Sequence, residues 1–139
     1  MKLLELALNK RKIFNCLCVL GACLIIVRMT LIGRTPSIRR YNLRLLWSIR
    51  GWIEGNPEGC DDTIQFLYNI VLFIPLGFSL KMAKNIRLKT TVIIAVLLSG
   101  VIEFIQYFGK IGLAEIDDVI SNTVGAIIGF VMFNVIRKI

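Results

Sequence analysis

The chain has 139 residues, of which 56% are apolar, and it carries a formal net charge of +8 with no histidine. A soluble domain of this size needs more polar surface than this composition supplies, so the bilayer is the expected solvent. The absence of histidine excludes catalytic triads and acid–base chemistry that depend on imidazole.

Four apolar segments are predicted to cross the membrane as helices. Hydropathy predicts them at residues 13–32, 64–80, 90–108 and 119–136. The first segment could instead be a cleaved signal peptide, because basic residues precede it. Its apolar run is too long for that role, however, and no small-residue cleavage site follows. We therefore expect an all-α membrane protein with four transmembrane helices, in which residues 1–139 form a single domain.

The loop between the first two spans predicts an amphipathic helix. Over residues 38–53, apolar and aromatic residues recur at helical spacing, whereas several arginines fall elsewhere. We expect this helix to lie in the outer headgroup region, with Trp47 and Trp52 at the interface. It could act only as an anchor, or its arginines could bind an anionic headgroup through paired contacts to phosphate.

The distribution of charge predicts the orientation in the membrane. Ten basic residues and one acidic residue fall in the N-terminal segment, the loop between the second and third spans, and the tail. The other two loops carry six basic and seven acidic residues. Because Lys and Arg are retained on the cytoplasmic side, we expect both termini to be cytoplasmic. The basic excess then reflects topology and contact with membrane lipids, and we expect no nucleic-acid partner.

Ionisable residues inside the predicted spans are the first candidates for a site. Such groups are costly in hydrocarbon and usually face the interior of a bundle, which singles out Arg28, Glu103, Asp117 and Asp118. At a rise of about 1.5 Å per residue, Arg28 and Glu103 lie at similar depths in the outer half of the bilayer. We expect these two residues to form a pair.

Three amides extend this candidate site. Gln106 lies on the same helical face as Glu103, and Asn122 lies on the same face as Asp118. Asn69 is near the outer end of the second span, so all these side chains should converge in the outer half. They could line a ligand pocket, or they could only join the helices through hydrogen bonds.

Proline and glycine residues predict how the helices pack. Pro75 lacks an amide hydrogen, and together with Gly77 it should kink or thin the second span. Gly125 and Gly129 are spaced to allow another helix to approach closely. The four cysteines lack the partners of a zinc site, so we expect no metal and no cofactor.

Three motifs follow one another in the second half of the chain. They are N-x-x-x-F-I-P-L-G at residues 69–77, S-G-x-I-E-F-x-Q at 99–106 and I-D-D-V-I-x-N-T-x-G-A-x-x-G at 116–129. Together they resemble the VanZ-like family of membrane proteins, with the best-matching region over residues 64–136. The positions that the resemblance marks are Asn69, Pro75, Gly77, Glu103, Gln106, Asp117, Asp118, Asn122 and Gly125.

The resemblance implies a multi-pass protein of the bacterial cytoplasmic membrane. The founding members of the family lower susceptibility to the glycopeptide antibiotic teicoplanin. Many members carry an arginine shortly before the paired aspartates, where this chain has Gly-Leu-Ala-Glu at residues 112–115. If that arginine has a role, Arg28 or Lys110 could replace it here.

Three functions are compatible with these residues. The first is a resistance-associated protein whose outer-leaflet polar pocket interacts with an envelope lipid, a cell-wall precursor or a lipoglycopeptide. The second is an intramembrane enzyme acting on a lipid-linked substrate, with Glu103 as general base and Asp117 or Asp118 as acid. Against it, the sequence offers no nucleophile with an adjacent base. The third is a structural membrane subunit in which the polar residues only hold the helices together.

Overall fold

The computed structural model describes residues 2–34, 38–55, 57–84 and 86–139, and for residues 2–8, 57–60 and 84 it describes the backbone alone. Its elements in chain order are α1 (Lys2–Leu31), β1 (Arg40–Asn42), α2 (Trp47–Ile53), α3 (Pro57–Lys84), α4 (Leu88–Gly109), β2 (Leu113–Glu115) and α5 (Ile116–Ile136).

Four helices of the described chain are long and apolar enough to cross a membrane. Their candidate spans are Asn9–Leu31, Asp61–Ala83, Leu88–Gly109 and Ile116–Ile136. This confirms the all-α membrane fold with four spans. The helix of the second span begins earlier than predicted, at Pro57, because proline is favoured in the first turn of a helix, where its missing amide hydrogen is not needed.

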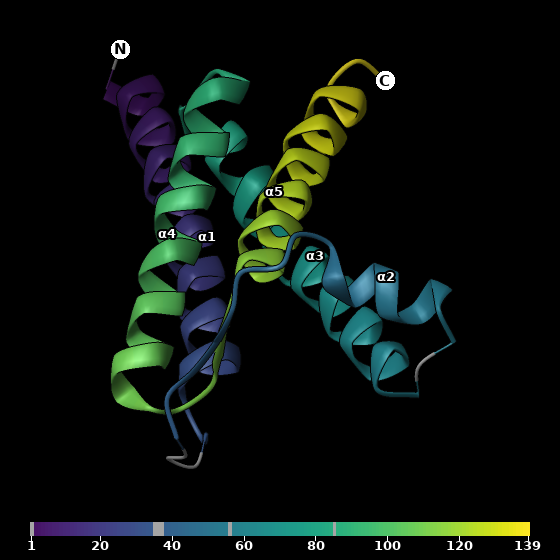
Figure 1. The fold of residues 1–139 in the computed structure, drawn as a ribbon. Helices are drawn as coiled ribbons and strands as arrows, with labels where there is room; N and C mark the ends of the chain where they lie inside the picture. Colours follow the sequence, from purple (N-terminus) through teal and green to yellow (C-terminus); the bar gives the residue numbers. More distant parts are fainter. Residues whose placement is uncertain (1, 35–37, 56, 85) are drawn as a thin grey trace.

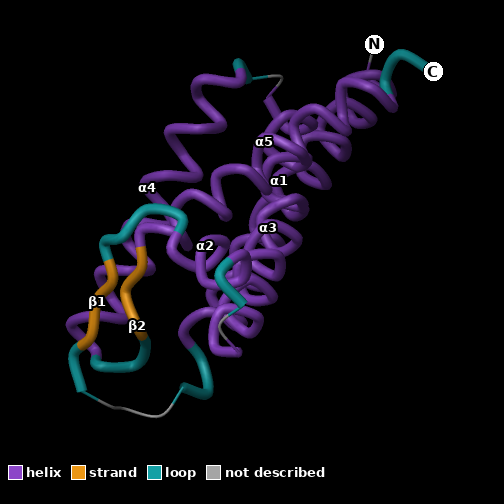
Figure 2. The backbone as a smooth tube through the Cα atoms, turned by 45° about the vertical axis from the view of Figure 1, so that its right-hand side comes forward, coloured by secondary structure: helices purple, strands orange, loops and turns teal. Residues whose placement is uncertain are grey.

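The long helices alternate in direction, so both ends of the chain lie at the same end of the bundle (Figure 1). We call this the terminal end; it comprises the start of α1, the end of α3, the start of α4 and the end of α5. The opposite end, which we call the loop end, carries residues 32–34, 38–55 and 110–115. Figure 2 shows both strands there, beside each other. The two strands are parallel, with Tyr41 opposite Ala114.

The backbones of α3 and α5 lie almost in contact. A Cβ atom built at Gly125 would collide with the carbonyl group of Ile70, and one at Gly129 would collide with that of Ile74. These two glycines therefore permit the close helix approach that their spacing predicts.

Pro75 and Gly77 lie within α3 itself. The helix continues through Pro75, whose position is exposed. Gly77 faces α5, where an added Cβ would collide with the backbone of Ala126. Gly77 thus contributes to the same close contact from the α3 side. Within α3, the Ser79 hydroxyl group donates a 2.6 Å hydrogen bond to the Pro75 carbonyl group.

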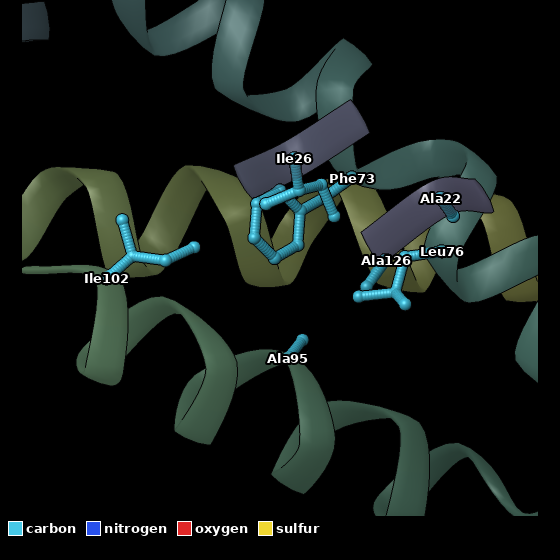
Figure 3. Packing of buried hydrophobic residues seen from close by; sticks show 7 residues of the cluster. All are labelled: Ala22, Ile26, Phe73, Leu76, Ala95, Ile102 and Ala126. Carbon is cyan, nitrogen blue, oxygen red and sulfur yellow. The ribbon is translucent and has the colours of Figure 1, made fainter. Parts of the chain in front are cut away.

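The apolar core lies where the four long helices meet. Figure 3 shows its members, which are Ala22, Ile26, Phe73, Leu76, Ala95, Ile102 and Ala126. Many other apolar side chains of α1 and α4 stay exposed, such as Leu24 at 60% and Phe104 at 62%. Such side chains suit contact with lipid, where packing rather than burial from water holds helices together.

The predicted helix over residues 38–53 is wrong in its first half. Only Trp47–Ile53 is helical, whereas Arg40–Asn42 is extended and pairs with β2. The Asn42 side chain accepts a 3.1 Å hydrogen bond from the Arg44 amide, and local bonds of this kind compete with a helix. A short α2 between the first two spans remains, with Trp52 exposed and Trp47 half-buried.

Candidate functional site

Four carboxylates gather at the loop end. Glu103 comes from α4, Glu115 from β2, and Asp117 and Asp118 from the first turn of α5. The sequence analysis selected three of them and missed Glu115, which lies outside the spans. The only sequence signal for Glu115 is its place two residues before the aspartate pair.

Asp117 holds the start of α2. Its two carboxylate oxygens accept hydrogen bonds from the Leu46 amide (2.6 Å), the Ser48 amide (3.2 Å) and the Ser48 hydroxyl group (3.0 Å). Leu46 lies in the left-handed region at φ 53° and provides no side-chain cap, so Asp117 supplies the cap from another helix. Asp117 is 1% exposed, and both of its oxygens accept hydrogen bonds that hold α2.

Asp118 joins α5 to α3. The Asn69 side-chain amide donates a 2.7 Å hydrogen bond to the Asp118 Oδ1 atom, and both residues are buried. This is the convergence of Asn69 and Asp118 that the sequence predicts.

Glu103 joins α4 to β2. Its Oε2 atom accepts a 2.9 Å hydrogen bond from the Glu115 backbone amide. The Glu103 side chain is 9% exposed, and the negative charges of Asp118 and Glu115 act on it. Buried carboxylates that act on one another are typical of functional sites.

The Gln106 and Asn122 side chains form hydrogen bonds with residues other than the four carboxylates. Gln106 donates a 3.1 Å hydrogen bond to the Thr30 carbonyl group on α1, and Asn122 donates a 2.7 Å hydrogen bond to the Ser99 hydroxyl group on α4. Both side chains therefore connect helices. Their own amide oxygens are buried and have no hydrogen-bond partner within the part of the chain that the structure describes.

The predicted pair of Arg28 and Glu103 is wrong. Arg28 is exposed and donates a 3.2 Å hydrogen bond to the Ile32 carbonyl group at the end of its own helix, where cations are favoured. The cation whose charge acts on both Glu103 and Asp118 is Arg34.

The Arg34 guanidinium group also lies beside Gly112, the first residue of the segment in which the resemblance implies an arginine. Its Nη1 atom is 3.0 Å from the point that a Cβ atom of Gly112 would occupy. The structure thus brings Arg34, rather than Arg28, beside Gly112. Sequence spacing did not single out Arg34, because it follows α1 while Gly112 precedes α5.

Glu115 is the carboxylate of this group that lies outside the spans. Burial raises the pKa of Glu115 to about 7, and the negative charge of Asp118 adds to this increase. A 2.8 Å hydrogen bond from the Trp47 indole nitrogen opposes the increase. Near neutral pH, Glu115 therefore exchanges between its charged and neutral forms.

A cavity of about 370 Å³ opens beside these groups, and we call it the loop-end cavity. Its walls are largely apolar and aromatic, with two carboxyl groups among them. Residues that define it are Tyr41, Leu43, Glu103, Phe104, Tyr107 and Glu115. Such a site suits a ligand with an apolar body and a small polar part.

Metal binding is not indicated by these side chains. Across the described residues, no group of three or more cysteine, aspartate or glutamate side chains is arranged to hold a metal ion. The arrangement can instead accept hydrogen bonds and hold or release a proton at Glu115.

Comparison with known proteins places this arrangement in a family. A sequence profile of the VanZ/LLP1 family matches residues 13–137. Protein VanZ of Enterococcus faecium is 33% identical over 75 residues, which are 53% of this chain and 47% of that protein. The chain thus spans about half the length of this curated relative, and no solved structure matches the chain significantly. Because the profile extends from the first span to the last, the chain belongs to the VanZ/LLP1 family and is a multi-pass membrane protein.

Proposed function

We propose that this chain lowers susceptibility to teicoplanin and that its loop-end cavity binds an amphiphilic molecule of the cell envelope. Family membership and the similarity to Protein VanZ support the link to resistance. One observation carries the binding role, namely the buried Glu103 carboxylate in the wall of an otherwise largely apolar cavity. A buried carboxylate needs water, a partner or a ligand to remain charged.

The charges of the cavity define the ligand class. Glu103 and Glu115 are acceptors, so the polar part of the ligand donates hydrogen bonds through hydroxyl, amide or amine groups. An acyl chain or aromatic body fits against Tyr41, Phe104 and Tyr107. Lipid-linked cell-wall precursors and lipoglycopeptides combine both features, whereas a purely anionic headgroup would be repelled by the two carboxylates.

The cavity faces the outer leaflet in this proposal. The terminal end carries the excess of basic residues, and such residues are retained in the cytoplasm. The termini are then cytoplasmic. The loop end lies on the outer side of the bacterial cytoplasmic membrane. An external antibiotic or precursor would meet the loop-end cavity directly.

Binding is favoured over catalysis by the position of Asp117. The hydrogen bonds from Leu46 and Ser48 hold both of its oxygens, so Asp117 is not free to act as the acid of an enzyme. Glu103 and Asp118 remain, but each also accepts a hydrogen bond within the protein, Glu103 from the Glu115 amide and Asp118 from the Asn69 side chain.

Expression in a susceptible Gram-positive host tests the proposal. The inhibitory concentrations of teicoplanin and vancomycin would be compared for the wild type, Glu103→Gln and the control Glu54→Gln, an exposed residue directly after α2. Loss of a charged hydrogen bond costs about 1.5–3 kcal/mol, so Glu103→Gln should weaken ligand binding roughly tenfold or more. Resistance should fall at unchanged membrane abundance, while the control keeps it. Full resistance in Glu103→Gln would refute the binding role.

A further inference from the structure

A second cavity lies at the terminal end, far along the bundle from the carboxylates. It has a volume of about 610 Å³ and is lined by residues from the first half of α1, the end of α3 and the end of α5. Figure 1 shows both chain ends at this end of the bundle. We call it the terminal cavity.

The terminal cavity is basic. Arg11, Lys12, Lys81 and Arg137 line it, and no acidic residue does. Among the residues whose side chains the structure describes, none of those in the nearby turns of α1, α3, α4 and α5 is acidic. Glu5 occurs earlier in α1, and its side chain is outside the described part.

Lys81 is the most fixed of these cations. Its ammonium group donates a 3.1 Å hydrogen bond to the Ile86 carbonyl group and lies 4.6 Å from the centre of the Phe130 ring. Among the side chains that the structure describes, Lys81 thus meets a carbonyl group and an aromatic face but no carboxylate. A negatively charged ligand in the cavity would complete its surroundings.

The other walls of the terminal cavity are apolar except for Asn15, whose side-chain amide donates a 3.2 Å hydrogen bond to the Met82 carbonyl group. Phe78 of α3 and Phe133 of α5 meet edge to face with ring centres 5.2 Å apart, and Met82 and Ile136 lie beside them. A ligand held here would therefore contact hydrocarbon as well as positive charge.

We propose that the terminal cavity binds the phosphate group of an anionic phospholipid from the leaflet at this end of the bundle. Arg11, Lys12, Lys81 and Arg137 contact the headgroup, and the phenylalanine walls contact the first part of the acyl chains. Basic pockets between transmembrane helices bind phospholipid headgroups in this way. The apolar walls and the position of the cavity at the end of the spans favour a lipid over free phosphate.

This site is separate from the loop-end cavity and does not depend on the function proposed for it. It takes the opposite charge, is formed by other ends of the helices and needs none of the four carboxylates.

Native mass spectrometry of the full chain in a neutral detergent tests the site. The titrated probes are phosphatidylglycerol, phosphatidylcholine with the same acyl chains, and inorganic phosphate as a competitor. The test variant is Arg11→Gln with Arg137→Gln, and the control is Arg87→Gln with Lys89→Gln. All four positions are exposed, and the control removes the same charge at the same end but outside the cavity.

The wild type should retain phosphatidylglycerol in preference to phosphatidylcholine. Each cation near the headgroup contributes about fivefold to affinity, so the cavity variant should bind phosphatidylglycerol roughly 30-fold more weakly. The control variant should bind it as the wild type does. Inorganic phosphate should not displace it.

Three results would overturn the proposal. Equal losses in the cavity and control variants would show that only the general surface charge matters. Equal binding of phosphatidylcholine would remove the role of the headgroup charge, and displacement by inorganic phosphate would assign the site to the free ion. Arg137→Gln alone, beyond the last turn of α5, gives the same test with the least disturbance and an expected loss of about fivefold.

Discussion

The terminal end and the loop end each enclose a cavity, but their charged groups are held in different ways. At the terminal end, Arg11, Lys12 and Arg137 are exposed, and their long side chains can adjust to a ligand. At the loop end, the Asp117 and Glu103 carboxylates accept hydrogen bonds from backbone amides. The exposed cations at the terminal end favour anionic ligands in general. The hydrogen-bonded carboxylates at the loop end instead hold neighbouring segments in place.

This difference has a physical basis in the cost of burial. Long basic side chains reach water or headgroups from the end of a helix, so they need no internal partner. Carboxylates have short side chains and stay where the backbone places them, so each one must be satisfied within the protein. Changes at the loop end that remove a hydrogen-bond acceptor, such as Asp117→Ala, should therefore disturb structure. Changes of the exposed cations at the terminal end should mainly disturb the proposed phospholipid binding.

The most complete contrast between the two ends should be their accessibility from outside the cell. In a chain whose native cysteines are replaced by serine, Glu54→Cys at the loop end should react fully with a membrane-impermeant thiol reagent on intact cells. Lys89→Cys at the terminal end should react only after the cells are opened. Reversed labelling would place the loop-end cavity in the cytoplasm.

The close contact between α3 and α5, which lies between the two ends, should be the part of the fold most sensitive to substitution. Gly129→Ala puts a methyl group against the Ile74 carbonyl group and the Phe78 amide, and helix backbones cannot yield as side chains do. We expect a loss of about 3 kcal/mol in the free energy of unfolding and much less folded protein in the membrane. Gly21→Ala, where nothing lies within 4 Å of the added carbon, should accumulate normally. Similar accumulation of both variants would argue against the close contact.

A substitution at Asp117 should affect the loop end without affecting the terminal end. Asp117→Ala removes the acceptor for Leu46 and Ser48, and the stranded amides should cost about 2 kcal/mol. We expect α2 to loosen, so that limited trypsin digestion cuts faster after Arg50. Phosphatidylglycerol binding at the terminal cavity should stay unchanged. Asp61→Ala, which removes an exposed carboxylate, is the control, and equal cleavage of the two variants would contradict the capping role.

The smallest expected difference between the ends is in pH dependence. The pKa of Glu115 rises from 4.5 to about 7 in the folded chain, so the folded state binds more protons than the unfolded state between these values. The contribution of Glu115 to stability is therefore complete below pH 4.5 and is lost as the pH rises toward 7. Thermal unfolding of the full chain in detergent should show a shallower decline over this range for Glu115→Gln.

The Arg11→Gln and Arg137→Gln double variant gives the control for this pH series. It removes no carboxylate, so it should keep the decline of the wild type. A decline that is the same in Glu115→Gln and the wild type would show that other groups cause it.

The spans and the helix contacts could be predicted from sequence because both depend on local properties. Hydrophobic length identifies a transmembrane helix, and the spacing of Gly125 and Gly129 places both on one face. The two strands could not be predicted in this way. Each has three residues and exists only because its partner, distant in the sequence, lies alongside it.

Most residues of the candidate site could be predicted from sequence. The hydrogen-bond and charge partners of these residues could not. Asp117 and Asp118 were treated as a pair, yet successive residues of a helix point about 100° apart. As a result, Asp117 faces α2 and Asp118 faces α3. Arg34 was missed because a residue in a loop has no helical face from which its neighbours can be inferred.

The pairing of β1 with β2 also determines when the loop end can form during synthesis. Arg40–Asn42 and Ser48 leave the ribosome long before Leu113–Glu115 and Asp117 exist to bind them. Closing so long a loop adds little entropy cost once both partners are present, but it cannot begin earlier. A nascent chain that has inserted α1, α3 and α4 would therefore have an unpaired β1, an uncapped α2 and a terminal cavity without its α5 wall. The walls of the loop-end cavity from β2 and α5 would be in place only after the last helix has entered the membrane.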